Sequence, residues 1–204
     1  MIDVEVFSKP GVGKYNEDYV LHTEIEPDIS LIVICDGMGG LSYGADASKI
    51  IAHSIDNYLR QALCSDSPKQ PVIDAIHYAN NELAKECSRL NSKMGASVAL
   101  TLFLDNTCYY TWLGDVRIYL ATRGKTELLT KDHLAIEGNH SFLSRCINGK
   151  EFRHSPEVRE LEISSGDELY IATDGYYLHN KIVSPSESAI IADDDATIVY
   201  IKLK

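Results

Sequence analysis

The sequence predicts an α+β fold in which two helices lie between two groups of strands along the chain. Three observations support this fold class. Apolar and acidic residues alternate at the N-terminus, two apolar stripes at helical spacing run through residues 51–90, and short β-branched runs separated by turns follow. Because the helices cluster instead of alternating with single strands, the order is typical of α+β proteins rather than of a βαβ sheet.

The first forty residues predict three strands. Every second residue of the segment 2–6 is apolar, which is the signature of a half-buried strand. Further strands are predicted over 19–23 and 29–35, with a turn at Pro27-Asp28 between them. The third of these strands ends at the glycine-rich segment 36–40.

Two helices are predicted next. Ile51, Ile55 and Leu59 recur at helical spacing in the first, and Ser42 is a candidate cap for its start. A loop is expected over residues 65–71, which are mostly polar and include two prolines. The second helix carries a mostly apolar stripe made of Ile76, Asn80, Leu83, Cys87 and Leu90.

The remainder of the chain predicts strands again. The segments expected to form them are 97–104, 108–113, 116–122, 158–163, 168–172 and 197–203. Residues 131–157 are polar and mixed, without a clear period. No internal repeat or low-complexity tract divides the chain.

The composition fits one globular domain of 204 residues. The net charge is −11 and the chain has no Lys/Arg cluster, which argues against nucleic acid as a partner. No apolar run approaches the roughly 18 residues that span a bilayer, so no membrane partner is expected. Five cysteines without a CxxC pair indicate reduced thiols in a cytoplasmic protein.

Five acidic or glycine-rich signals lie at the edges of predicted strands. They are Asn16-Glu17-Asp18, Asp36-Gly37-Met38-Gly39-Gly40, Gly114-Asp115-Val116-Arg117, Thr173-Asp174-Gly175 and Asp193-Asp194-Asp195. Taken singly each signal is weak, because an Asp-Gly pair is usually a turn and consecutive aspartates usually form a solvated loop. Together they offer the oxygen ligands that hard divalent cations prefer.

In their order these segments resemble the metal-dependent protein phosphatases called PP2C or PPM. Residues 33–40 are similar to the second acidic motif of that family in its bacterial form, and residues 111–119 match the central motif almost position by position. The other segments that carry the resemblance are 16–18, 94–97, 129–133, 166–175 and 194–199. The resemblance therefore runs through the whole chain.

The resemblance implies a fold as well as a family. It predicts a single domain over residues 1–204, built as a four-layer α-β-β-α sandwich of two mainly antiparallel sheets flanked by helices. Family members carry a substrate-contacting flap where this chain has residues 131–157. Because this stretch is short here, we expect a shortened flap and a more open cleft.

The resemblance also implies a site for two Mn²⁺ or Mg²⁺ ions, with a weaker third ion. Asp36 would bridge the two ions, and the carbonyl of Gly37 would bind one of them. The first ion is completed by Asp174 and Asp194, the second is held by Glu17 and Asp18 partly through water, and Asp115 serves the third together with Asp174. Asp36, Asp174 and Asp194 are the expected catalytic residues.

The expected activity is hydrolysis of phosphoserine and phosphothreonine in proteins by a metal-activated water. The expected partners are a phosphorylated protein and a serine/threonine kinase signalling system, in a bacterial cytoplasm. Two alternatives stay open. One is a catalytically weak pseudophosphatase module that binds phosphoproteins or kinases, and the other is an enzyme acting on a small phosphate ester.

The chain departs from the family pattern at two positions near the expected site. Gly13 stands where the family commonly has a phosphate-gripping arginine, and Lys14 beside it is either a phosphate ligand or an ordinary surface lysine. Met38 stands where some members have a histidine proposed as general acid. Alternative proton donors, or plain surface or core histidines, are His133, His140 and His179.

Overall fold

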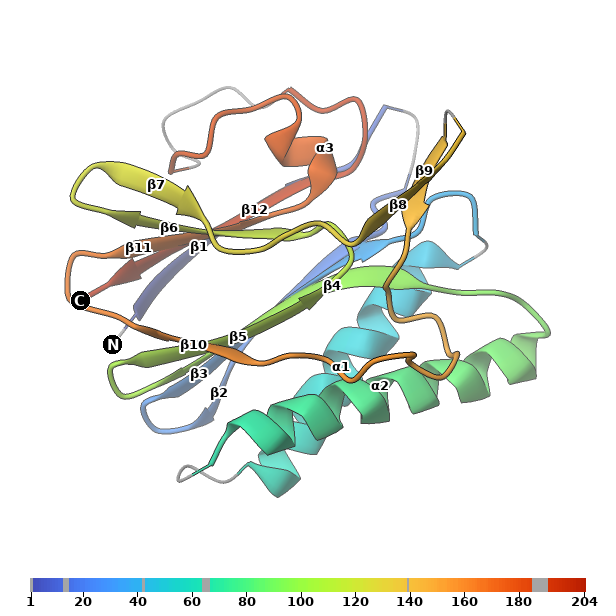
Figure 1. Cartoon of the computed structure of the whole chain (residues 1–204), viewed down its shortest axis with the longest axis horizontal. Coiled ribbons are helices and arrows are strands. Elements are labelled where there is room, and N and C mark those ends of the chain that lie inside the picture. Colours follow the sequence, from blue (N-terminus) through green and yellow to red (C-terminus); the bar gives the residue numbers. More distant parts are fainter. Residues whose placement is uncertain (1, 13–14, 42, 64–66, 139, 185–190) are drawn as a thin grey trace.

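The computed structural model describes residues 2–12, 15–41, 43–63, 67–138, 140–184 and 191–204. Two five-stranded antiparallel sheets pack face to face, and two long helices cover the outer face of one of them (Figure 1). This arrangement confirms the predicted α+β class and the pair of antiparallel sheets.

The first sheet joins the two ends of the chain. Its order is β1 (Ile2–Lys9), β12 (Ala196–Leu203), β11 (Glu168–Ala172), β6 (Arg117–Thr122) and β7 (Lys125–Leu128). All eight residues of β1 pair with β12, so the segment before β12 lies close to the segment after β1. The acidic segments 16–18 and 193–195 follow β1 and precede β12, respectively.

The second sheet comes from the middle of the chain. Its order is β10 (Arg159–Glu162), β5 (Thr107–Leu113), β4 (Ala96–Leu104), β3 (Ile29–Gly37) and β2 (Asp18–Glu26). Strands β3 and β4 are buried along almost their whole length, because helices cover one face of this sheet and the other sheet covers the opposite face.

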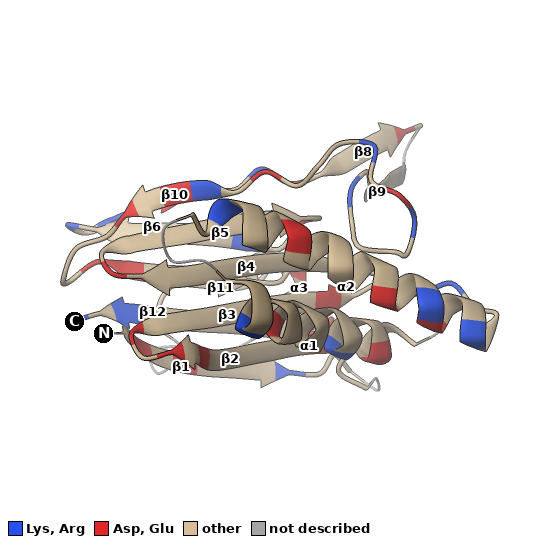
Figure 2. Ribbon diagram, turned by 90° about the horizontal axis from the view of Figure 1, so that it is seen from below, with Lys and Arg blue, Asp and Glu red and all other residues tan. Residues whose placement is uncertain are grey.

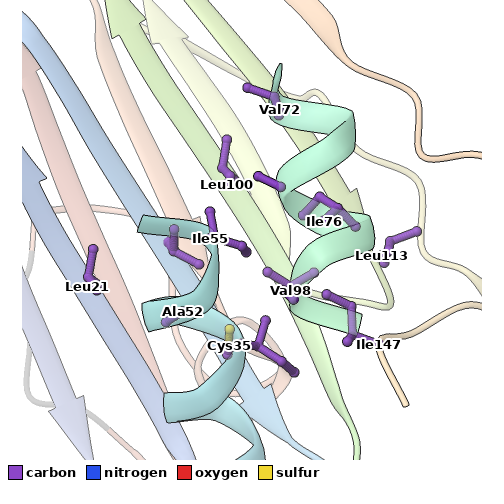
Figure 3. Packing of buried hydrophobic residues seen from close by; sticks show 14 of the residues in the cluster. Leu21, Cys35, Ala52, Ile55, Val72, Ile76, Val98, Leu100, Leu113 and Ile147 are labelled. Atoms are coloured by element: carbon purple, nitrogen blue, oxygen red, sulfur yellow. The ribbon is translucent and has the colours of Figure 1, made fainter. Parts of the chain in front are cut away.

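Helices α1 (Gly44–Ala62) and α2 (Lys69–Leu90) lie side by side on the second sheet (Figure 1). Figure 3 shows how Ile55 and Ile76 from the helices meet Val98 and Leu100 of β4. These side chains are almost fully buried, and each contributes roughly 1.5–3 kcal/mol by leaving water. The charged residues of both helices are all at least partly exposed, and Figure 2 marks where they lie along the two ribbons.

The starts of both helices differ from the sequence prediction. Ser42 lies outside the described residues, and Tyr43 occupies the cap position of α1 without a side-chain hydrogen bond. Helix α2 begins at Lys69, inside the loop expected over 65–71. Pro71 is tolerated there because the first helical turn leaves its backbone N–H groups unpaired, so proline forfeits no helical hydrogen bond.

A second apolar core fills the space between the two sheets. Ile32, Ile34 and Ala99 of one sheet meet Ile171 and Val199 of the other. This core holds the two sheets in contact, so the ends of their strands stay together at the rim. The side chains that project from those ends are therefore fixed relative to one another.

The outer face of the first sheet has a thin cover. Helix α3 (Asp174–Tyr177) is a single turn, and the fully buried Tyr176 packs against Tyr170, Ile198 and Tyr200 of the sheet. The helical layer is therefore much lighter here than on the α1–α2 side. None of the described helices is both long and apolar enough to cross a membrane.

A small hairpin stands apart from both sheets. It consists of β8 (Leu134–Glu137) and β9 (His140–Leu143), within the stretch 131–157 that shows no clear period in the sequence. Ile136 is 81% exposed on it and Phe142 is 48% exposed. Because little of the hairpin is buried, its sequence carries no strong alternation, and whether it is a shortened flap stays a prediction.

Candidate functional site

The predicted acidic residues meet at one end of the sandwich. Antiparallel pairing places Asp18 of β2 opposite Asp36 of β3, and Asp36 opposite Ser97 of β4. A cavity of about 360 Å³ opens at this end of the sheets. The carboxylate residues and the glycine predicted for the site that line it are Glu17, Asp36, Gly37, Asp115, Asp174 and Asp194.

Asp18 lies behind the cavity wall rather than on it. Its side chain is only 8% exposed, and the hydroxyl of Thr173 donates a hydrogen bond to its Oδ2 at 3.0 Å. Its Oδ1 is buried and has no hydrogen-bond partner among the described residues. Burial raises the pKa of this carboxyl to about 7, against the lowering effect of the Thr197 and Thr173 hydroxyls.

Four other carboxylates, those of Asp18, Asp115, Asp174 and Asp194, act on Asp36. Burial and then repulsion from neighbouring carboxylates raise its pKa well above the ordinary value, and the first of these neighbours is Asp18. The pKa of Asp174 is also raised, mainly by burial and by the charge of Asp115. Carboxylates gathered in this way stay ionised only if a cation compensates them.

Gly37 brings the first two acidic segments into contact. Its N–H donates to the carbonyl of Glu17 at 3.2 Å, and the Ser48 hydroxyl donates to the same carbonyl at 2.7 Å. A Cβ at Gly37 would lie 2.6 Å from the carbonyl oxygen of Gly44. Only glycine allows this approach, which explains the Asp-Gly pair as a packing requirement as well as a candidate ligand.

Asp115 is oriented by one group from strand β4 and one from helix α3. The Ser97 hydroxyl donates to its Oδ1 at 2.7 Å, and the Tyr177 hydroxyl donates to its carbonyl at 3.1 Å. The preceding Gly114 has φ +114°, and a Cβ there would lie 2.4 Å from Ser97 Oγ. The Gly-Asp pair therefore lets the end of β5 pack directly on β4.

Asp195 is a site residue whose role the sequence prediction missed. It is only 7% exposed, and its two carboxylate oxygens accept the N–H of Gly11 at 2.8 Å and the N–H of Glu17 at 2.7 Å. It thereby holds both ends of the loop between β1 and β2. Its place in the Asp-Asp-Ala-Thr segment was the available signal, but a run of three aspartates does not reveal which one is buried.

The donor set fits a hard divalent cation. It combines crowded carboxylates with a buried, unpaired oxygen on Asp18. Among the described residues, no three His, Cys, Asp or Glu side chains are arranged closely enough to hold a metal ion unaided. An ion bound here would take its remaining oxygen ligands from water and from backbone carbonyls, as Mg²⁺ commonly does.

The remaining predicted residues are placed as follows. Lys14, the candidate phosphate ligand, and Gly13 lie outside the described residues, as does the side chain of His140. Met38 lines the cavity. His133 lines a neighbouring hollow and accepts the N–H of Gly114 through Nδ1 at 3.2 Å, whereas His179 does not line the carboxylate cavity.

Known protein phosphatases are similar to this chain over nearly its whole length. The family model of protein phosphatase 2C matches residues 8–193. A putative protein phosphatase 2C-type of Streptococcus pyogenes is 24% identical over 188 residues, which cover 89% of this chain and 73% of the relative.

Solved structures share the fold. The serine/threonine phosphatase PstP/Ppp of Mycobacterium tuberculosis superposes with a TM-score of 0.81 at 20% identity, covering 100% of this chain and 99% of the other. The catalytic domain of PstP in complex with two manganese ions gives a TM-score of 0.78 at 21% identity, with 100% and 99% coverage.

Proposed function

Since the chain belongs to the protein phosphatase 2C family, we propose that it hydrolyses phosphoserine and phosphothreonine residues of proteins. The observation that carries this proposal is the cavity in which carboxylates from five separate chain segments face one another. The substrate it implies is a phosphorylated protein.

We propose that two Mn²⁺ or Mg²⁺ ions bind in this cavity, with a weaker third ion. Asp36, Asp174 and Asp194 would hold one ion, Asp36 would also bind the second, and the carbonyl of Gly37 would bind one of the two. When bound, the ions supply an activated water and offset the charge of the phosphoryl group. The crystal structure of the PstP catalytic domain in complex with two manganese ions supports the number and kind of ions proposed.

The other acidic residues take supporting roles in this proposal. Glu17 lines the cavity and its backbone is held on both sides, by Asp195 at the N–H and by Ser48 at the carbonyl. Asp18 is set back from the cavity, so it would act on the second ion through water. Asp115, which Ser97 orients, would serve the third ion together with Asp174.

Further parts of the proposal concern the cellular setting. A protein that removes phosphate from serine and threonine requires a kinase that adds it, so we place this chain in a serine/threonine kinase signalling system. A cytoplasmic location and a single domain with a shortened flap remain predictions of the sequence. The pseudophosphatase alternative has no specific support, because every carboxylate of the expected set is present.

The test is hydrolysis of p-nitrophenyl phosphate and of a phosphothreonine peptide with Mn²⁺, with Mg²⁺ and with EDTA. We expect turnover with either ion and none with EDTA. Asp36→Asn should lower kcat by at least about a hundredfold, because electrostatic and metal-holding groups of this kind contribute several kcal/mol to catalysis.

The matched control is Asp105→Asn at the far end of β4. Asp105 lies in a turn with φ +51°, a conformation that asparagine adopts readily, so both its stability and its activity should stay unchanged. If wild-type protein binds Mn²⁺ by calorimetry but hydrolyses neither substrate, the binding-module alternative replaces the proposal.

A further inference from the structure

A second hollow, of about 320 Å³, lies beside the carboxylate cavity and is lined by basic side chains. Leu134, at the start of the β8–β9 hairpin, lines both spaces and forms the wall between them. The cations that line the hollow are Lys131, Arg145 and Arg159. A basic hollow is unusual in a chain of net charge −11.

The base of the hollow is fixed to the acidic site. The rings of Trp112 and His133 stack with centroids 5.6 Å apart, and the Trp112 indole donates to the carbonyl of Lys131 at 2.8 Å. His133 and Gly114 exchange two hydrogen bonds, of 2.9 and 3.2 Å. Because Gly114 directly precedes Asp115, the hollow and the carboxylate cavity keep a fixed separation.

Two of the three cations are held in position by their neighbours. Arg145 donates to the carbonyls of His154 and Ser155 at 3.0 and 3.2 Å. Arg159 lies 5.0 Å from the centroid of the Trp112 ring and forms an ion pair with Glu157 at 3.2 Å. Their guanidinium groups are thus arranged before any ligand arrives, which lowers the entropy cost of binding.

The balance of charge in the hollow favours an anion. Its two carboxylates are already engaged, since Asp132 pairs with Arg117 through bonds of 3.0 and 2.8 Å and Glu157 pairs with Arg159. Lys131 forms no ion pair with any residue in the described part of the chain. A bound anion would therefore meet Lys131 and Arg145 without displacing an acidic side chain.

We infer that this hollow binds a second anionic group of the phosphoprotein substrate, a phosphate or a carboxylate a few residues from the phosphoryl group that is hydrolysed. The inference rests on the proposed function, because it is the substrate in the carboxylate cavity that brings the second group past Leu134. The rest of the strongly acidic surface repels such a group, so the hollow would select substrates by local charge.

The test uses phosphothreonine peptides that carry one additional residue, placed two to six positions away on either side. That residue is a non-hydrolysable phosphonate, glutamate or alanine. At the matching position we expect KM to fall by roughly threefold to tenfold for the anionic residues relative to alanine, with kcat little changed. A fall with phosphonate alone identifies a second phosphate as the ligand, whereas a fall with both identifies any anion.

Variants of Lys131 test whether the preference for anionic peptides depends on the hollow. Lys131→Ala should remove most of it and Lys131→Glu should reverse it, while Lys125→Ala on the exposed strand β7 should leave it intact. Hydrolysis of p-nitrophenyl phosphate should be the same in all four proteins, because this substrate does not reach the hollow. Raising the salt concentration should weaken the wild-type preference.

Two results would overturn the inference while leaving the proposed function standing. One is equal KM for anionic and neutral peptides at every spacing, and the other is an unchanged preference in Lys131→Glu. If wild-type protein hydrolyses no substrate with any metal, the proposed function has failed instead. The same peptides are then labelled with a fluorophore, and their affinity, measured by fluorescence anisotropy, decides whether the hollow binds an anion.

Discussion

At the scale of single residues, Asp195 lines the cavity while its carboxylate is engaged by the backbone. Both of its oxygens accept backbone N–H groups, one from each end of the loop between β1 and β2. An asparagine has only one accepting oxygen, and its amide group would face one of the two donors. This position thus uses aspartate for its geometry, although the charge adds to the crowding around Asp18.

Substitutions at Asp195 should produce a graded loss of stability. Asp195→Ala leaves two backbone N–H groups without an acceptor and should lower the free energy of unfolding by about 2–4 kcal/mol. Asp195→Asn keeps one hydrogen bond and should cost roughly half as much. Urea denaturation of both variants measures this order, and Asp193→Asn, at an exposed neighbouring position, should change stability by less than about 0.5 kcal/mol.

Measurements of metal affinity show whether Asp195 positions Glu17 or only stabilises the fold as a whole. Both Asp195 variants should bind Mn²⁺ more weakly by calorimetry at temperatures where they are fully folded, because the Glu17 backbone is no longer held. If the alanine and asparagine variants are equally stable, the stabilisation does not come from two backbone hydrogen bonds to Asp195.

At the scale of elements, Gly37 at the end of β3 and Gly39 just beyond it have different requirements. A Cβ at Gly37 would collide with the backbone of Gly44 at 2.6 Å, whereas a Cβ at Gly39 would approach only Glu17 Oε2, at an ordinary 3.7 Å. Neither glycine has a positive φ, so the difference between them is one of space alone.

Alanine should therefore disrupt the fold at Gly37 and be tolerated at Gly39. Gly37→Ala forces backbone to move and should destabilise the fold by about 1–3 kcal/mol, with loss of metal-dependent turnover. Gly39→Ala should change stability by less than about 0.5 kcal/mol. Thermal denaturation and p-nitrophenyl phosphate hydrolysis check both. A Gly37→Ala protein as stable as the wild type would show that the β3–α1 connection is more adaptable than its contacts indicate.

The elements themselves were predictable to different degrees. Strands β3 and β4 are recognisable as continuous, mostly apolar runs because both of their faces are buried. The stripes of α1 and α2 have a strong period because burial constrains every third to fourth residue. The start of α2 was misplaced since proline in a first turn resembles a loop. The β8–β9 hairpin was missed because its exposed residues obey no burial pattern.

The site was predictable as a set of residues but not as an arrangement. The five acidic signals are visible in the sequence, and the structure brings all of them to one end of the sandwich. That Asp18 lies behind the wall and that Asp195 binds backbone depends on the packing of the two sheets, which no local pattern encodes. The basic hollow draws its lining from segments as far apart as Trp112 and Arg159.

At the scale of the whole molecule, the crowded carboxylates set the pH dependence of the metal-free protein. Burial raises the pKa of Asp18 from its ordinary value of 3.8 to about 7 in the folded state, and the pKa of Asp36 is also raised. The folded protein therefore retains protons that the unfolded chain releases. Stability from these groups is complete below about pH 4 and is lost as the pH rises through the folded pKa.

In EDTA, the free energy of unfolding should accordingly fall as the pH rises from 5 to 8. The slope should reach about 1 kcal/mol per pH unit for each group that titrates in this window. Saturating Mn²⁺ should remove or reverse the fall, since the cation replaces the protons as the partner of the carboxylates. Urea denaturation at several pH values measures both curves, and parallel curves with and without Mn²⁺ would contradict the assignment of the cation to this cluster.

The pairing of the first strand with the last has a consequence for how the protein is made. Glu17 emerges from the ribosome long before the carboxylate that secures its backbone, which is 178 positions later in the chain. A nascent chain therefore exposes its acidic N-terminal segment while the catalytic centre is still incomplete. Activity can begin only after synthesis has passed Asp195 and β12 has inserted between β1 and β11.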